Sequence, residues 1–198
     1  MAVVTDLLIK PAHKQPMAAV DKMHVSEAGI KDNIACGPLR QVLMLEQRTL
    51  NEFHLQPGDL RENIIVRDFD LYGLSSGSVI KIGDALIGLT FLCEPCKIIA
   101  DKVNLKDIRP QRGMLGRFLN DGIIAAGDTV TLTDQTIEPV PFETVDRIAW
   151  HLDKIDRTIT AAELMWQVGL ASSYCRALPA MIRKHAKIDG GKIVFGNM

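Results

Sequence analysis

The sequence lacks a long apolar run, a secretory leader and a cysteine framework. Its longest apolar stretch is far too short to span a bilayer. The N-terminal residues 1–6 reach an acid at once, without the basic and then apolar regions of a signal peptide. The 4 cysteines show no framework spacing. We therefore expect a protein of the reducing cytoplasm with no membrane segment.

Several catalytic and ligand-binding motifs are also missing. None of the 5 histidines belongs to a paired H-x₃₋₅-H, and a structural zinc ion needs four ligands, so a zinc site is disfavoured. Neither G-x-x-x-x-G-K-[ST] nor G-x-G-x-x-G occurs, and no Ser-His-Asp order or H-E-x-x-H is present. Nucleotide binding by those loops and hydrolase chemistry therefore have no support.

Composition indicates an ordinary globular chain. Of its 198 residues 47% are hydrophobic and 24% are charged, enough for one mid-sized domain and a small appendage. The net charge of −1 argues against a surface devoted to nucleic acid, although a local basic patch stays open.

Short β-like runs dominate the first two thirds of the chain. We expect strands at 2–9, 17–25, 41–45, 64–66, 79–82, 85–90, 123–125 and 129–132, and a short helix at 48–53. Gly83-Asp84 and Gly127-Asp128 each stand between two such runs, which is the signal of a two-residue hairpin with glycine first. The sequence predicts a mainly antiparallel β domain over residues 1–137, closed into a barrel.

The pattern changes at the Pro-rich segment 138–141, which reads as a stiff linker. Apolar residues then recur at helical spacing from Val145 to Ile155. Thr160 and Glu163 form a capping box for a second helix, which Gly169 is placed to end, and Ser172 or Ser173 can cap a third. Residues 138–198 are therefore predicted to be a small three-helix extension with a β-like tail at 192–195.

The order of helix, turn, helix and Gly-Gly-Lys in this extension also fits a winged helix-turn-helix. Over residues 139–198 the cations number eight and the acids six, and Pro179 falls inside the would-be recognition helix, which it should kink or end. A small bundle that packs on the β domain or dimerises is the favoured interpretation, and contact with DNA is the disfavoured one.

Cys96 is the best candidate for a reactive atom. It follows an apolar strand and Pro95, and Lys97 places a positive charge beside it, which favours an accessible thiolate. Cys93 and Cys96 also form a C-x-x-C, so a redox pair or two ordinary core cysteines remain alternatives.

Arg109 and Arg112 flank a short Pro/Gly turn further on. Such charged residues most often lie in a solvent-exposed loop without a specific function. The functional interpretation is an anion cradle, because guanidinium groups bind phosphate bidentately.

With these motifs in order, residues 1–135 resemble the MOSC family, named for the C-terminal domain of molybdenum cofactor sulfurases, and in particular its stand-alone bacterial members. The resemblance rests on Gly37-Pro38-Leu39-Arg40, Arg61-Glu62-Asn63-Ile64, the Gly83-Asp84 hairpin, Glu94-Pro95-Cys96-Lys97 and the segment from Gly122 to Asp128. Each motif is short, and their order makes the match.

The resemblance implies a β-barrel with short helices and a bound molybdenum cofactor in its molybdopterin form. The signature cysteine, which falls on Cys96, would coordinate the metal or carry sulfur as a persulfide. Arg40 matches the family's Gly-Pro-x-Arg motif, and Glu62 and Asn63 match the Glu-Asn pair that shapes the pocket. Arg112, by its charge, and Lys97 are further candidates for the cofactor's phosphate.

Three positions depart from the family pattern. Ala35-Cys36 precedes Gly37-Pro38 where members often have His-Gly, Asp32-Asn33 stands where Gly-Asp is usual, and Cys93 stands where many relatives have arginine.

Two functions follow from this resemblance. The first is a cofactor-dependent reductase of N-hydroxylated compounds, or a sulfur carrier, acting through Cys96 with an electron-donor or sulfur-donor protein; a homodimer stays open. The second is a cofactor-free scaffold that serves as a binding or regulatory module, whose tail contacts DNA or a protein partner.

Overall fold

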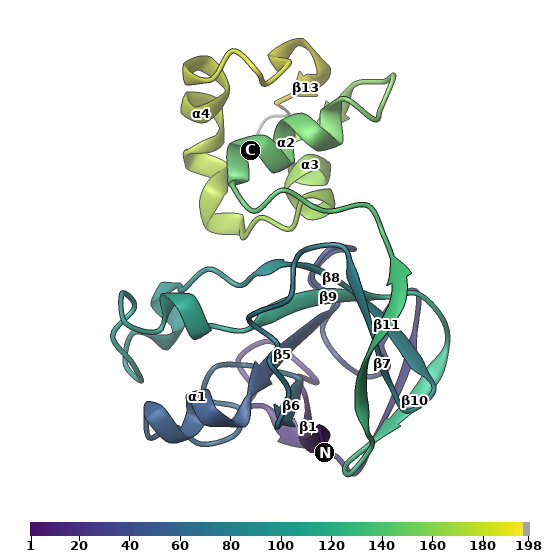
Figure 1. Ribbon diagram of the computed structural model, residues 1–198. Helices are drawn as coiled ribbons and strands as arrows, with labels where there is room; N and C mark the ends of the chain where they lie inside the picture. The colour runs from purple at the N-terminus through teal and green to yellow at the C-terminus, as the bar shows by residue number, and fades with distance from the viewer. Residues whose placement is uncertain (196–198) are drawn as a thin grey trace.

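The computed structural model describes residues 1–195 and consists of a β unit and a smaller helical unit above it (Figure 1). The strands of the β unit are β1 Val3–Ile9, β2 Ala18–Ala19, β3 Lys22–Ser26, β4 Gly29–Ile30, β5 Val42–Glu46, β6 Ile64–Arg67, β7 Ser78–Ile82, β8 Ala85–Leu92, β9 Met114–Phe118, β10 Gly122–Ala125 and β11 Val130–Thr136. One α-helix, α1 (Gln47–Glu52), and two 3₁₀ turns, η1 (Lys97–Ile99) and η2 (Arg109–Gln111), lie among them. A mainly β fold with added helices is thus confirmed.

The large sheet has the strand order β11-β7-β8-β9-β5-β6-β1-β2, and β10, β3 and β4 form a second sheet. The ladders do not close into the expected continuous barrel. The two sides of the large sheet meet instead at an isolated bridge between Val3 and Thr129. A hydrogen bond of 2.9 Å from the Val4 N–H to the Asp128 carbonyl lies beside this bridge. Closure is therefore local, because β1 is held by β6 and only its first residues reach the β11 side.

β5 is the central strand, and every one of its residues is buried. Val42 and Met44 pack into the main core inside the sheet. Leu43 and Leu45 alternate with them and face outward, into two separate apolar clusters. The candidate site lies on this outer face of the sheet. The face is covered by α1, η1 and η2 at one end and by the helical unit at the other.

The two Gly-Asp signals have different outcomes. Gly83 has φ +55 between paired Ile82 and Ala85, so the β7–β8 hairpin is confirmed. The hairpin at Gly127-Asp128 is wrong: β10 pairs with β3, and β11 pairs with β7. The turn itself forms, since Gly127 has φ +90 and the Asp128 N–H donates to the Ala125 carbonyl, but burial of apolar side chains selects other strand partners.

The strand expected at 17–25 is split. β2 pairs with β1, whereas β3 pairs with β10 and β4. Val20 and Asp21 lie between them, where the chain passes from one sheet to the other.

The helical unit comprises α2 Thr144–Leu152, β12 Ile159–Thr160, α3 Ala161–Gln167, η3 Ser172–Arg176, α4 Leu178–Lys184, η4 Gly190–Lys192 and β13 Ile193–Val194. It has its own apolar cluster, which includes Ile148, Leu164 and Leu178. The domain boundary after residue 137 stays a prediction. The N-cap half of the predicted capping box is confirmed, since Thr160 Oγ1 accepts from the Glu163 N–H at 3.1 Å. The Glu163 carboxylate pairs with Arg157. The alternative caps at Ser172 and Ser173 concern side chains outside the described part.

Two features of this unit bear on the winged-helix alternative: the first removes the objection based on Pro179, and the second speaks against a wing. Pro179 lies in the first turn of α4, where no backbone donor is needed, so it starts that helix instead of kinking it. Gly190–Lys192 is a 3₁₀ turn, and the strand after it pairs in parallel with β12 over two residues. An antiparallel wing is therefore not formed by the described residues.

Candidate functional site

The motifs singled out in the sequence meet on the outer face of the sheet. At the end of β8, the Cys93 N–H donates to the Gly113 carbonyl at 2.8 Å. This bond joins the chain just before Cys96 to the chain just after Arg112. The Asn63 N–H donates to the Leu43 carbonyl at 2.7 Å and brings the Glu-Asn pair beside β5. The segments after β8, before β9 and before β6 are thus held on this side of the sheet, next to β5.

Residues 94–97, here called the Cys96 turn, expose the candidate thiol. Cys96 has extended backbone (φ −133, ψ 166), and its carbonyl accepts from the Ile99 N–H at 3.2 Å. Cys96 and Lys97 are exposed, whereas Ile99 is fully buried. An accessible sulfur on an anchored backbone can bind a soft metal or attack an electrophile.

Cys93 has a different environment. It is buried against Leu39, Phe91 and Leu115, and both Cys93 and Cys96 are free thiols. Cys93 thus fits the alternative of an ordinary core cysteine, and Cys96 does not.

Arg112 and Glu62 are buried charges close to each other. The Glu62 carboxylate accepts from the Gly58 N–H at 2.6 Å through Oε1, while its Oε2 has no hydrogen-bond partner in the described part. The Arg112 Nε and Nη1 atoms are buried and likewise have no partner there. Burial raises the pKa of Glu62, and the positive charge of Arg112 acts against that rise. Unpaired guanidinium donors beside the Cys96 segment have the chemistry of an anion site.

Asn63 is committed to the scaffold. Its Oδ1 accepts from the Leu43 N–H at 3.1 Å, and its Nδ2 donates to the Leu8 carbonyl at 3.1 Å. Nδ2 also lies 3.3 Å from Asn33 Oδ1. Asn63 can therefore shape a pocket by fixing β1 and β5, with little capacity left for a ligand.

Arg40 lies between the two units. Its Nη1 donates to the Gly169 carbonyl at 3.0 Å, and its Nη2 lies 4.0 Å from the Cys93 sulfur. The preceding Gly37 packs so closely on α3 that a Cβ there would lie 2.4 Å from the Trp166 carbonyl oxygen. The Gly-Pro-x-Arg motif is thus a contact surface for the helical unit, and its role toward a cofactor stays a prediction.

Sequence reasoning missed the contacts that Arg147, Gly169 and Tyr174 make between the two units, because their partners lie far away in the chain. The sequence marks Gly169 only as the end of a helix. Arg147 is 1% exposed, and its guanidinium carbon stands 3.9 Å from the centre of the Phe91 ring. Burial lowers the pKa of Arg147 to about 10, so the side chain is still charged at neutral pH.

A cavity of about 280 Å³ opens between the two units, lined among others by Asn33, Cys36, Gly37, Trp166 and Gln167. Cys36 is exposed, as Cys96 is, but belongs to a different loop. It supplies a natural control thiol for experiments on Cys96.

Within residues 1–195, no helix is both long enough and apolar enough to cross a membrane.

The sequence model of the MOSC domain matches residues 32–131, which is just over half of the chain. The protein therefore belongs to the MOSC domain family, which is associated with the molybdenum cofactor. No significant match was found among curated proteins.

Solved structures share the fold at low sequence identity. The YuaD protein from Bacillus subtilis matches with a TM-score of 0.57 and 18% identity, over 66% of this chain and 94% of its own. A hypothetical protein matches with a TM-score of 0.56 and 18% identity, over 96% and 93%. YiiM from Geobacillus stearothermophilus matches with a TM-score of 0.55 and 16% identity, over 91% and 99%. The last two matches extend well into the C-terminal helices.

Proposed function

We propose that this protein binds the molybdenum cofactor in its pterin form and that the Cys96 thiolate is the protein's ligand to the metal. The observation that carries the proposal is the exposed thiol of Cys96 on a turn whose neighbours Cys93 and Ile99 are buried. Thiolate sulfur suits such a metal because both are soft.

The buried residues Arg112 and Glu62 support the binding of an anionic ligand near this turn. Arg112 would hold the cofactor's phosphate through its unpaired guanidinium donors, and the nearby Glu62 carboxyl acts on that guanidinium only through its charge. Lys97, exposed next to the thiol, adds a second positive charge at the surface. Asn63 would keep the pocket in shape through its bonds to β1 and β5.

When bound, the cofactor supplies the redox chemistry, and by family resemblance the substrate would be an N-hydroxylated compound such as a hydroxylamino base. The protein's residues hold and orient the reactants, and a separate protein would donate the electrons. In a variant of the proposal, Cys96 carries sulfur as a persulfide and passes it on.

Metal and pterin content after anaerobic purification tests the proposal. The wild-type chain, Cys96→Ser and Cys36→Ser would each be produced in a host that makes the cofactor. Cys36 is the matched control, because it is also an exposed thiol but lies outside the Cys96 turn. We expect wild type and Cys36→Ser to carry molybdenum and pterin together, and Cys96→Ser to lose at least about tenfold of both.

Wild-type protein that carries neither component, or Cys96→Ser protein that carries as much as wild type, would contradict this function. Sulfur on Cys96 without molybdenum, seen as a mass increase of one sulfur atom that reductant removes, would favour the carrier variant.

A further inference from the structure

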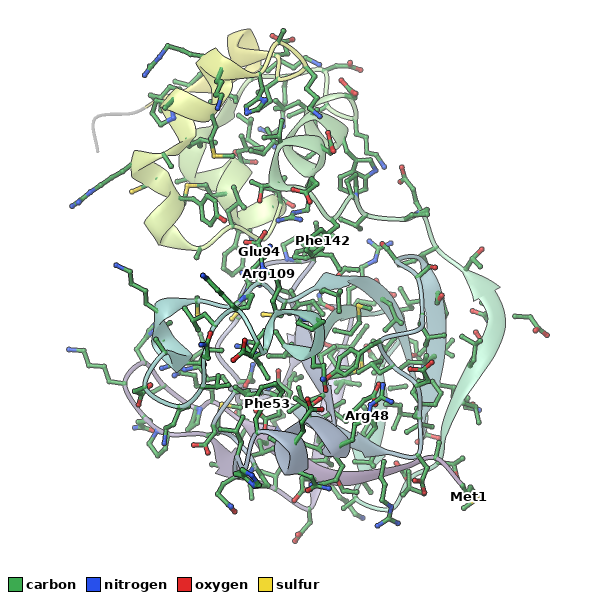
Figure 2. All side chains as sticks on the ribbon, turned by 60° about the vertical axis from the view of Figure 1, so that its left-hand side comes forward. Met1, Arg48, Phe53, Glu94, Arg109 and Phe142 are labelled. Atoms are coloured by element: carbon green, nitrogen blue, oxygen red, sulfur yellow. The ribbon has the colours of Figure 1, made fainter. Side chains whose placement is uncertain are left out.

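A hydrogen bond from the helical unit holds the Cys96 turn. Tyr174, in η3, donates its hydroxyl to Glu94 Oε2 at 3.0 Å, although the two residues are 80 positions apart. Figure 2 shows Glu94 where the two units meet, near Phe142 of the interdomain segment, while Arg48 and Phe53 lie farther away on the β unit.

A buried positive charge explains why Glu94 faces the helical unit. Arg147 donates from Nε to the Val168 carbonyl at 2.8 Å and from Nη1 to the carbonyls of Pro141 and Phe142 at 3.1 and 2.6 Å. These partners are neutral, so the charge of Arg147 is left to be balanced from a distance. Glu94 is the acid that acts most strongly on it. Burying a charge is costly without an opposite charge nearby, so Arg147 favours an inward-facing Glu94.

The backbone between Glu94 and Cys96 is short and stiff. Pro95 has a fixed φ, so few rotations separate the two residues. Before the turn, the Cys93 N–H is bonded to the Gly113 carbonyl. After it, Ile99 is buried and donates to the Cys96 carbonyl. Between these anchors, the bond from Tyr174 joins the helical unit directly to the turn.

We infer that Tyr174 is a positioning residue for Cys96. By holding Glu94, it fixes the backbone that presents the thiol, so that the helical unit is part of the site and not an appendage. The importance of Tyr174 for activity rests on the proposed function of Cys96. Its structural role, which is to hold the turn, does not depend on that function.

Amide hydrogen exchange of the full-length chain without cofactor tests the inference, because it reports local opening. Four amides report on the segment after Cys96, namely those of Ile99, Ala100, Lys102 and Val103, all bonded to carbonyls within 96–99. Tyr174→Phe keeps the ring and removes the hydroxyl. We expect these amides to exchange about tenfold faster in Tyr174→Phe, while amides of β5 keep their wild-type rates.

Partner variants separate a specific hydrogen bond from general damage. Glu94→Gln keeps an oxygen acceptor for Tyr174, so exchange should stay near the wild-type rate. Glu94→Ala removes the acceptor, and in that background Tyr174→Phe should have no further effect. Tyr72→Phe is the matched control, since the Tyr72 hydroxyl also bonds at about the same length, 3.0 Å to the Gln111 carbonyl, but does not touch the turn.

Unchanged exchange in folded Tyr174→Phe would overturn the inference. So would faster exchange spread equally over β5, or an equal effect of Tyr174→Phe with and without Glu94. Molybdenum content of the same variants is measured separately. If wild type never binds the cofactor, the proposed function fails and the exchange result stands; if wild type binds it through Cys96 but exchange is unchanged, the positioning role fails.

Discussion

Arg40 of the β unit and Gly169 of the helical unit are in direct contact. Arg40 Nη1 donates to the Gly169 carbonyl at 3.0 Å, and a Cβ on Gly169 would lie 2.8 Å from Arg40 Cδ. Gly169 has φ +67, a conformation that side chains disfavour. One glycine therefore ends α3 and admits the arginine of a sequence motif located 129 residues earlier.

Replacing Gly169 by alanine should cost more than backbone strain alone. Gly127 is the matched control, because it has φ +90 and a Cβ there would meet nothing within 4 Å. We expect Gly127→Ala to lower the free energy of unfolding by about 1 kcal/mol, and Gly169→Ala by about 2–3 kcal/mol, since the added methyl group displaces Arg40. Urea denaturation of both variants measures the difference, and equal costs would show that Arg40 adapts without loss.

Local signals in the sequence predicted local structure well. Thr160 and Glu163 lie within one helical turn, so their capping bond depends on nothing distant. Gly83 likewise supplies the positive φ that its hairpin needs. At Gly127 the same signal produces the turn but not the hairpin, because the partner of a strand is chosen by which apolar faces can be buried together.

The candidate site was predictable as a set of motifs but not as a set of contacts. The strand-Pro-Cys-Lys order indicated a thiol on a turn, and Cys96 is exposed there. The resemblance to the Gly-Pro-x-Arg motif marked Arg40 as a cofactor-binding residue, whereas its hydrogen bond goes to the Gly169 carbonyl. Spacing in one sequence contains no information on a partner in another unit. For this reason the contacts of Tyr174 and Arg147 were not predicted either.

Arg147→Lys should destabilise the chain even though the charge is kept. The guanidinium satisfies the carbonyls of Pro141, Phe142 and Val168, and stands over Phe91. A lysine ammonium lacks this planar fork and is more costly to dehydrate, so we expect a loss of about 2–4 kcal/mol in urea denaturation. Arg157→Lys is the control, because its pair with Glu163 is at the surface and should change little. A loss no larger than that of the control would contradict the assigned role of Arg147.

Tyr72 should make stability depend on alkaline pH. Burial raises the pKa of Tyr72 from 10.0 to about 12, and its hydroxyl lies 3.0 Å from Thr49 Oγ1. The unfolded chain therefore loses this proton at lower pH than the folded chain does. The stability that Tyr72 contributes is full below about pH 10 and is lost as pH rises through about 12.

Urea denaturation of wild type and Tyr72→Phe at pH 8, 10 and 11.5 checks this dependence. We expect wild type to be the more stable at pH 8 and its advantage to shrink toward pH 11.5. A constant difference across that range would show that Tyr72 ionises alike in both states.

The helical unit should not bind duplex DNA appreciably. Of its eight Lys and Arg residues, five already have partners within the chain: Arg147, Lys154, Arg157, Lys187 and Lys192. Among the interactions described for residues 138–195, Arg176, Arg183 and Lys184 are the exposed cations that have no assigned partner. Because affinity for DNA rises with the number of phosphates neutralised, so few cations give weak binding even at low salt.

Fluorescence anisotropy with a random duplex measures this, using the full-length chain at about 50 mM and 200 mM salt. We expect no saturable binding at micromolar protein. Binding that weakens steeply between the two salt concentrations, and that Arg183→Glu with Lys184→Glu abolishes, would instead support a DNA-contacting module. The double variant Lys154→Glu with Arg157→Glu serves as control, since it makes the same charge change at two cations that are already engaged by Glu138 and Glu163.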